Sequence, residues 1–368
     1  KGKGSLLFVR LRQWSGFTFY YGGVFRDLHL KNEFQCSKLA TDKAQHLEKR
    51  RAELMAKGLP KKLPIPGVKH ILLVASGKGG VGKTTTAVNL ACAMKVVNPS
   101  KEIGLLDADV FGPSVPLMMH LSGEPMLNND HLMEPLLNYG VKCMSMGLLV
   151  SGEGAVVWRG LMVMQALERL TRQVAWGPLD CLVVDTPPGT GDTHLSLAQN
   201  LPISGAIIVT TPQLASIQVS RRGATMFEKL HIPILGIVEN MAHSTCANCG
   251  SVNHIFGENT DALAQQLHIP VLESFELHHR VSESTATGRP IVISDPDSNY
   301  SLKYKSLAKK VYEYLQQDES HIQSKTSRVM KRSINLSICQ INASNIICKL
   351  SLLFRERVSV NIIYDSIK

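Results

Sequence analysis

Long apolar runs are missing from the sequence, and cysteine is scarce for its length. No stretch of about 18 consecutive apolar residues occurs in the 368 residues, which argues against a membrane-spanning helix. Eight cysteines in a chain of this length do not form a disulfide scaffold. The apolar content of 44% is nevertheless ample for a packed core, and it excludes global disorder.

Acidic residues are absent from the first 26 positions, which contain five Lys and Arg among Leu, Phe, Trp and Ser. A basic, acid-free segment that also carries apolar residues is typical of a mitochondrial presequence. We therefore expect residues 1–40 to be a presequence that directs the protein to the mitochondrial matrix. A disordered arm is the alternative.

An excess of positive charge is missing from the middle of the chain, although the whole chain carries +10. Residues 1–69 contain 15 Lys and Arg against 5 Asp and Glu, and residues 317–368 contain 8 against 4. Residues 70–316 are left with 17 against 21, a net charge of −4. The central part therefore has no charge excess for nucleic acid, and we expect no nucleic-acid partner.

Composition divides the chain into four parts. Residues 41–67 are expected to form an exposed helix followed by a proline-rich linker, because the prolines of 58–67 are too dense for regular structure. Residues 68–316 alternate short apolar runs with helical patterns, which predicts βαβ units and a mostly parallel sheet flanked by helices. Residues 317–368 have no clear period and are treated as an extension of unknown structure.

A glycine-rich segment of the form G-x-x-x-x-G-K-T lies between an apolar run at 70–75 and a helical pattern at 86–94. A glycine-rich loop between a strand and a helix presents backbone N–H groups and the positive end of the helix dipole to phosphate. The lysine of such a loop reaches the β- and γ-phosphates, and the hydroxyl that follows it suits Mg²⁺. The predicted nucleotide-binding residues are Gly77, Lys78, Gly79, Gly80, Val81, Gly82, Lys83, Thr84 and Thr85.

Carboxylates follow two later apolar runs. Asp107 and Asp109 end the run at 103–106, and Asp185 ends the run at 181–184. An acid after a buried strand, at this distance from a phosphate loop, indicates a Walker B carboxylate, so Asp185 is predicted to hold Mg²⁺. The loop at 189–192 follows directly and is predicted to sense the γ-phosphate through its backbone.

Cys246 and Cys249 form the one spaced cysteine pair, C-x-x-C, followed by Gly250. Two thiolates can grip one metal centre, but both Zn²⁺ and iron–sulfur clusters normally have four protein ligands. The set is completed either by His243, His254 or a distant cysteine, or by the same pair from a second chain. A [4Fe–4S] cluster that bridges a homodimer, a zinc site, and redox or structural thiols all remain possible from the residues alone.

The order of these motifs resembles a known family. With Lys78 directly after its first glycine, the phosphate loop resembles the deviant Walker A motif of the MinD/ParA-like P-loop NTPases. With residues 107–114, 158–160, 185–192, Asn240 and the cysteine pair, residues 58–316 resemble the Mrp/ApbC group of P-loop iron–sulfur carrier ATPases. The motifs at 58–60, 136–140 and 158–164 are similar to the mitochondrial branch of that group. The cytosolic relatives carry an additional N-terminal cysteine cluster, whereas Cys36 is the one cysteine before the phosphate loop here, which favours the same branch.

The resemblance implies roles for individual residues. Lys78 would reach the phosphates of the nucleotide bound by a partner subunit, and Asp109 would orient the attacking water, so both are expected to be catalytic. Asn240 matches the position whose amide reads adenine, a task to which a group that both donates and accepts is suited. Pro212 lies where the loop beside the base is expected. ATP is preferred because the guanine motif Asn/Thr-Lys-x-Asp is absent.

The same resemblance implies an ATP-dependent carrier that holds a [4Fe–4S] cluster at a homodimer interface and delivers it to apo-proteins. In the mitochondrial branch the recipients are subunits of respiratory complex I, and upstream assembly proteins supply the cluster. The alternative is a MinD/ParA-type switch ATPase that acts as a spatial organiser, with the cysteine pair as a structural zinc site.

Two positions depart from the family pattern. The helix after Pro212 normally carries an Asp where Val219 stands, and a later loop normally carries an Asp where Ala286 stands. Both changes put secondary switch or dimer contacts in doubt, but they leave the phosphate, Mg²⁺ and thiolate groups in place.

Overall fold

The computed structural model describes residues 62–149, 160–246, 248–318 and 320. All of them belong to the compact unit Lys61–Lys368, one of two into which the chain divides. The expected presequence, the helix at 41–58, Cys36, Trp158, Arg159 and nearly all of the extension after residue 317 lie outside the described residues. No helix in the described part of the chain combines the length and the apolar character that a bilayer crossing needs.

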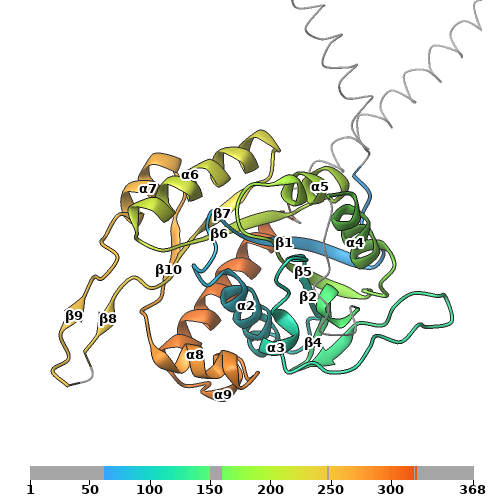
Figure 1. Ribbon diagram of the computed structural model, residues 1–368, viewed down its shortest axis with the longest axis horizontal. Coiled ribbons are helices and arrows are strands. Elements are labelled where there is room, and N and C mark those ends of the chain that lie inside the picture. The colour runs from blue at the N-terminus through green and yellow to red at the C-terminus, as the bar shows by residue number, and fades with distance from the viewer. Residues whose placement is uncertain (1–61, 150–159, 247, 319, 321–368) are drawn as a thin grey trace, which may run out of the picture. The chain divides into compact units, whose positions relative to one another are not determined.

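Eight strands form one sheet in the order β10-β7-β6-β1-β5-β2-β4-β3 (Figure 1). Every neighbouring pair is parallel except β3 and β4. The strands are β1 (Val68–Ser76), β2 (Ile103–Asp107), β3 (Leu136–Asn138), β4 (Val141–Ser145), β5 (Leu179–Asp185), β6 (Gly205–Thr210), β7 (Ile234–Glu239) and β10 (Val271–Ser274). The prediction of an α/β fold with a mostly parallel sheet is confirmed.

Helices cover both faces of the sheet, as parallel strands that are apolar on both sides require. They are α2 (Lys83–Val97), α3 (Val115–Met118), α4 (Gly160–Arg172), α5 (Asp192–Asn200), α6 (Leu214–Lys229), α7 (Thr260–Leu267), α8 (His279–Ala286), α9 (Ile291–Ser294) and a helix over residues 299–318. A 3₁₀ turn, η1 (Met146–Leu148), and a hairpin of β8 (Ser244–Thr245) and β9 (Val252–Asn253) complete the described elements.

The strand residues alternate between two cores. Leu72 and Val74 of β1 pack with α2, α9 and the helix over 299–318, whereas Ile71 and Leu73 pack with α4, α5 and α6. Leu72, Leu73 and Val74 are fully buried. Burial on both faces explains why these strands read as continuous apolar runs in the sequence.

The antiparallel edge strand β3 is a feature that the sequence reading did not predict. Tyr139 and Gly140 both have positive φ, 49° and 76°, between Asn138 and Val141. Two consecutive residues with positive φ form the tight hairpin turn that reverses the chain here. The turn lets β3 pair with β4 at the edge of the sheet without a crossover helix.

Candidate nucleotide site and cysteine hairpin

The predicted phosphate loop connects the carboxyl end of β1 to the first turn of α2. Gly80 and Gly82 have φ of 79° and 86°, conformations that side chains disfavour. Helix α2 begins at Lys83 without a side-chain cap, so its first N–H groups remain available at the loop. The local structure is therefore the anion-binding arrangement that the sequence predicts.

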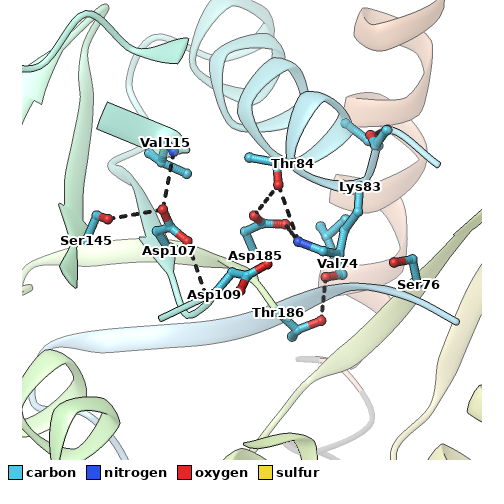
Figure 2. Close-up of polar contacts among 12 residues, drawn as sticks. Val74, Ser76, Lys83, Thr84, Asp107, Asp109, Val115, Ser145, Asp185 and Thr186 are labelled. Carbon is cyan, nitrogen blue, oxygen red and sulfur yellow. Dashed lines mark hydrogen bonds and ion pairs between the residues drawn. The ribbon is translucent and has the colours of Figure 1, made fainter. Parts of the chain in front are cut away.

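Asp185 lies at the centre of the site, at the end of the neighbouring strand β5 (Figure 2). The Lys83 Nζ atom lies 2.6 Å from its Oδ1, and the Thr84 hydroxyl donates a hydrogen bond of 2.7 Å to its Oδ2. Lys83 is 6% exposed and Asp185 is fully buried. Burial raises the pKa of Asp185, although the Lys83 ammonium and the Thr84 hydroxyl act in the opposite direction. The predicted P-loop and Walker B residues are thus brought together.

The two carboxylates after β2 occupy different environments. Asp107 is buried and accepts hydrogen bonds from the N–H groups of Val115 and Asp109 and from the Ser145 hydroxyl (Figure 2). Burial and the charge of Asp185 raise the pKa of Asp107 to about 7. Asp107 therefore fixes the loop that follows β2, and the half-buried Asp109 is the carboxylate that faces open space.

A cavity of about 520 Å³ opens beside Asp109. Its lining is mostly apolar and includes Phe111, Val163 and Pro188. The negative charge of Asp109 contributes to the raised pKa of Asp185. Asp109 thus borders a space large enough for solvent.

His194, in the first turn of α5, borders the same cavity and was not found from the sequence. Its Nε2 lies 3.0 Å from the Thr186 hydroxyl oxygen, and that hydroxyl donates to the carbonyl of Val74. Among the described residues His194 Nδ1 has no hydrogen-bond partner. Burial and the positive charge of Lys83 lower the pKa of His194 to about 4, so the ring is neutral at pH 7.

The remaining predicted nucleotide residues lie around the loop. Lys78 is exposed and its Nζ donates to Gln213 Oε1 at 3.2 Å, at the start of α6. Asn240 donates from Nδ2 to the Val81 carbonyl at 2.9 Å. Asn240 thus contacts the phosphate loop directly, a contact that its expected role toward adenine did not predict.

Pro212 is buried at the end of β6, and its carbonyl accepts a hydrogen bond of 2.9 Å from Asn259 Nδ2. This bond ties the loop after β6 to the segment just before α7. The expected place of Pro212, in the loop beside the nucleotide base, stays a prediction.

Cys246 and Cys249 lie in the turn of the β8–β9 hairpin, which extends away from the sheet in Figure 1. The turn is closed by the hydrogen bond from the Gly250 N–H to the Cys246 carbonyl, 2.9 Å, and Gly250 has φ of 70°. The sulfur of Cys249 lies 3.2 Å from the Ser251 hydroxyl oxygen. Hydrogen bonds from the side chain and backbone of Ser251 lower the pKa of the exposed Cys249 thiol.

The other described cysteines are chemically different. Cys92, Cys143 and Cys181 are buried, as the apolar runs around them indicate. Burial raises the pKa of Cys92 and of Cys181 to about 12. These thiols remain protonated, so among the described cysteines Cys249 is the one whose lowered pKa favours the thiolate.

Within the described residues of one chain, no group of three or more His, Cys, Asp and Glu side chains is placed to hold a metal ion. The rings of His243 and His254, the two histidines considered as further ligands, lie near each other with centroids 5.9 Å apart and planes tilted by 44°. Each has a carboxylate within 4 Å, Glu276 for His243 and Glu258 for His254. Neither histidine completes a ligand set with the cysteines.

Helix α6 lies directly against the phosphate loop, a packing contact that the sequence did not reveal. A Cβ atom placed on Gly77 would lie 2.6 Å from the backbone of Val219 and Ser220. Val219, one of the two departures from the family pattern, therefore contributes its backbone to this contact, whereas Ala286 is exposed at the end of α8.

We expect Gly77→Ala to destabilise the protein by about 1–3 kcal/mol, because the new methyl group meets backbone atoms that cannot rotate away. Thermal or denaturant unfolding measures the change. Gly79→Ala is the matched control, since a Cβ there lies 3.9 Å from Pro188 Cβ, an ordinary contact. Equal stability of the two variants would contradict the close approach of α6 to the loop.

We expect the stability of the wild type to fall, relative to His194→Gln, as the pH is lowered from about 6.5 to about 4. The unfolded chain binds a proton at this histidine below pH 6.5, whereas the folded protein keeps the ring neutral down to about 4. The loss reaches about 2–3 kcal/mol. Glutamine retains an N–H for Thr186 but does not titrate. Unfolding free energies measured across this range would contradict the assignment if the two curves stayed parallel.

The parallel sheet, the glycine loop between β1 and α2, and the carboxylate at the end of β5 define a P-loop NTPase. Residues 67–312 match the ParA family, described as NUBPL iron-transfer P-loop NTPase. The chain belongs to this family.

Relatives and solved structures agree with this assignment. The iron–sulfur cluster transfer protein NUBPL of Mus musculus is 52% identical over 73% of this chain and 84% of its own length. The Arabidopsis thaliana protein named iron–sulfur protein required for NADH dehydrogenase, mitochondrial, is 49% identical over 71% of this chain and 84% of its own. A nucleotide-binding protein of Archaeoglobus fulgidus in complex with ADP superposes with a TM-score of 0.55 at 34% identity, covering 64% of this chain and 92% of its own.

Proposed function

We propose that the protein is an ATP-dependent carrier of iron–sulfur clusters, in which two identical chains hold one [4Fe–4S] cluster between their hairpins. The observation that carries this proposal is the pair of the half-buried Cys246 and the exposed Cys249 in the hairpin turn, which has no third ligand among the described residues of its own chain. Two copies related by a two-fold axis would supply four thiolates. A cluster that is held at the surface and shared by two chains can be released, as a carried cluster must be.

The nucleotide is the second ligand of the proposal. Lys83 and the backbone of the glycine loop would bind the phosphates of ATP. The oxygen donors of Thr84 and Asp185, which lie 2.7 Å apart, match the hard ligands that Mg²⁺ prefers. Bound Mg²⁺ would neutralise charge that develops on the phosphates. Asp109 would orient the attacking water, and the exposed Lys78 would reach the nucleotide of the partner subunit.

The loop after Asp185 would connect the two sites through the dimer. ATP binding and hydrolysis would favour different arrangements of the two chains, and these would differ in their affinity for the cluster. Such a change needs no new chemistry at the cysteines. It needs two states of the dimer that hold the hairpins at different separations.

The recipients of the cluster are apo-proteins. The name of the Arabidopsis relative, which includes NADH dehydrogenase and mitochondrial, supports subunits of respiratory complex I as recipients. The protein would act in the mitochondrial matrix and receive the cluster from upstream assembly proteins. The acid-free residues 1–26 would be part of the presequence. A spatial organiser of the MinD/ParA type has no use for exposed paired thiols, and the −4 charge of residues 70–316 does not favour a DNA partner.

A transfer assay tests the proposal. Cluster-loaded protein is mixed anaerobically with an apo-enzyme whose activity needs a [4Fe–4S] cluster, in the presence of an iron chelator. We expect activity to return with the loaded protein, and at a rate that ATP changes, but not with an equal amount of free iron and sulfide. Equal restoration from free iron and sulfide, or none from the loaded protein, would contradict a carrier function.

A further inference from the structure

A basic groove is lined by residues of helices α5, α6 and α7 and includes none of the cysteine hairpin. It has a volume of about 590 Å³ and is lined by Leu195, Arg221, Arg222, Thr225, Met226, Lys229, Leu230 and Gln266. The apolar side chains Leu195, Met226 and Leu230 are half-buried, whereas the three cationic residues are exposed. The groove thus combines a recessed apolar floor with a cationic rim, and we call it the α6 groove.

The cations of the α6 groove are not neutralised. Within the part of the chain that the structure describes, Arg221, Arg222 and Lys229 form no ion pair, and no acidic residue lines the groove. Some lysines elsewhere in the described part are paired, such as Lys95 with Glu102 at 3.0 Å and Lys310 with Glu273 at 2.8 Å. Three unpaired cations on a body of net charge −4 mark a local site for an anionic partner.

The groove adjoins the nucleotide site through both of its main helices. The backbone of α6 at Val219 and Ser220 is the part that closely approaches Gly77. A Cβ placed on Gly223 would lie 3.8 Å from Cγ2 of Thr190, in the loop after Asp185. Leu195 of α5 follows His194, whose ring is bonded to Thr186. A ligand in the groove would therefore contact helices that touch the phosphate loop and the loop expected to sense the γ-phosphate.

We propose that the α6 groove binds an acidic, amphipathic peptide segment of a partner protein, and that the nucleotide state changes the affinity for it. Carboxylates of the segment would pair with Arg221, Arg222 and Lys229, and apolar side chains between them would fill the floor. The groove itself does not depend on the cluster-carrier proposal. Its coupling to nucleotide rests on ATP binding at the proposed phosphate site.

A peptide suits the groove better than an anionic membrane. Membrane-binding faces insert protruding apolar side chains below the level of the lipid headgroups. Here the order is reversed, because the apolar residues are recessed and the cations stand outside them. A narrow chain can enter such a concave surface, whereas a flat lipid surface reaches only its rim.

Fluorescence anisotropy with a short labelled peptide of alternating Glu and Leu, and the cluster-free full-length protein, tests the proposal. Peptides of alternating Gln and Leu and of alternating Lys and Leu are the ligand controls. The groove variant is Arg221→Glu/Arg222→Glu. The matched control variant is Lys62→Glu/Lys309→Glu, which changes the net charge by the same amount at two exposed lysines that do not line the groove. Binding is measured without nucleotide, with ADP, and with a non-hydrolysable ATP analogue.

Of the three peptides, we expect only the Glu–Leu peptide to bind the wild type. Its affinity for the groove variant should be at least tenfold lower than its affinity for the wild type or the control variant. Exchanging ADP for the ATP analogue should change the affinity about fivefold. Equal binding to all three proteins, or no binding, would overturn the groove assignment. So would binding of the protein to vesicles of phosphatidylcholine and phosphatidylglycerol, measured by co-sedimentation, together with no binding of the Glu–Leu peptide. A peptide affinity that is the same with ADP and with the ATP analogue would overturn the proposed coupling between the groove and the nucleotide site.

Two further measurements separate this inference from the proposed function. The groove variant should still bind the ATP analogue and should still take up a cluster, because Arg221 and Arg222 contact neither site. Loss of peptide binding with both of these retained assigns the effect to the groove. Failure of cluster uptake in the wild type would count against the carrier function and would leave peptide binding to be judged on its own.

Discussion

Lys83→Ala is expected to abolish ATP binding. The Lys83 ammonium is buried at the site where the glycine loop, Thr84 and Asp185 meet, and it is the group that would neutralise the β- and γ-phosphates. Titration calorimetry with Mg²⁺ and ATP measures the loss. Lys309→Ala, at an exposed lysine far along the chain, is the control and should bind ATP normally.

The same substitution should also destabilise the fold, because it leaves the buried Asp185 without its cationic partner. Removing one member of a buried ion pair costs about 3–5 kcal/mol. Adding Asp185→Asn should therefore restore much of the stability but none of the ATP binding. This pair of results separates a binding role from a merely structural one. Unchanged ATP affinity in a folded Lys83→Ala protein would show that the loop is not the nucleotide site.

Cys246→Ala/Cys249→Ala is expected to remove the cluster completely. The two thiols lie in the hairpin turn, Cys246 half-buried and Cys249 exposed. The remaining described cysteines are buried with a raised pKa, so they cannot replace the missing ligands. Iron and sulfide analysis and the visible absorption after anaerobic reconstitution measure the loss. Cys92→Ala, at a buried thiol, should keep the cluster.

The double variant should retain ATP binding, because the hairpin does not contribute to the phosphate loop. If iron and sulfide persisted in the double variant at the level of the wild type, the assignment of the cluster to the hairpin would be wrong. If the wild-type protein instead contained one zinc ion per chain and no iron, the cysteine pair would be better explained as a structural metal site.

Sequence reasoning was most effective where function and local structure depend on the same few residues. The glycines around Lys83 require a strand before them and a helix after them, and both are found at β1 and α2. The apolar runs that end in Asp107 and Asp185 are buried on both faces, so their carboxylates emerge at the same edge of the sheet. Those signals are local, and the parallel topology then brings them together.

Contacts between distant segments were not predictable in the same way. Nothing near Gly77 in the sequence indicates that α6 lies against it, and the bond from Lys78 to Gln213 joins residues 135 positions apart. His194 reads as an ordinary helical residue, and only the packing of α5 shows its ring bonded to Thr186. Asn240 was identified through resemblance, but its bond to the Val81 carbonyl came from the structure.

Native mass spectrometry of the anaerobically reconstituted wild type tests most directly whether two chains share one cluster. The protein is supplied with iron, sulfide, Mg²⁺ and ATP, and its intact mass is measured together with its metal content. Our account predicts a species of two chains that carries a single [4Fe–4S] cluster. A single chain that carries one zinc ion under these conditions would contradict it.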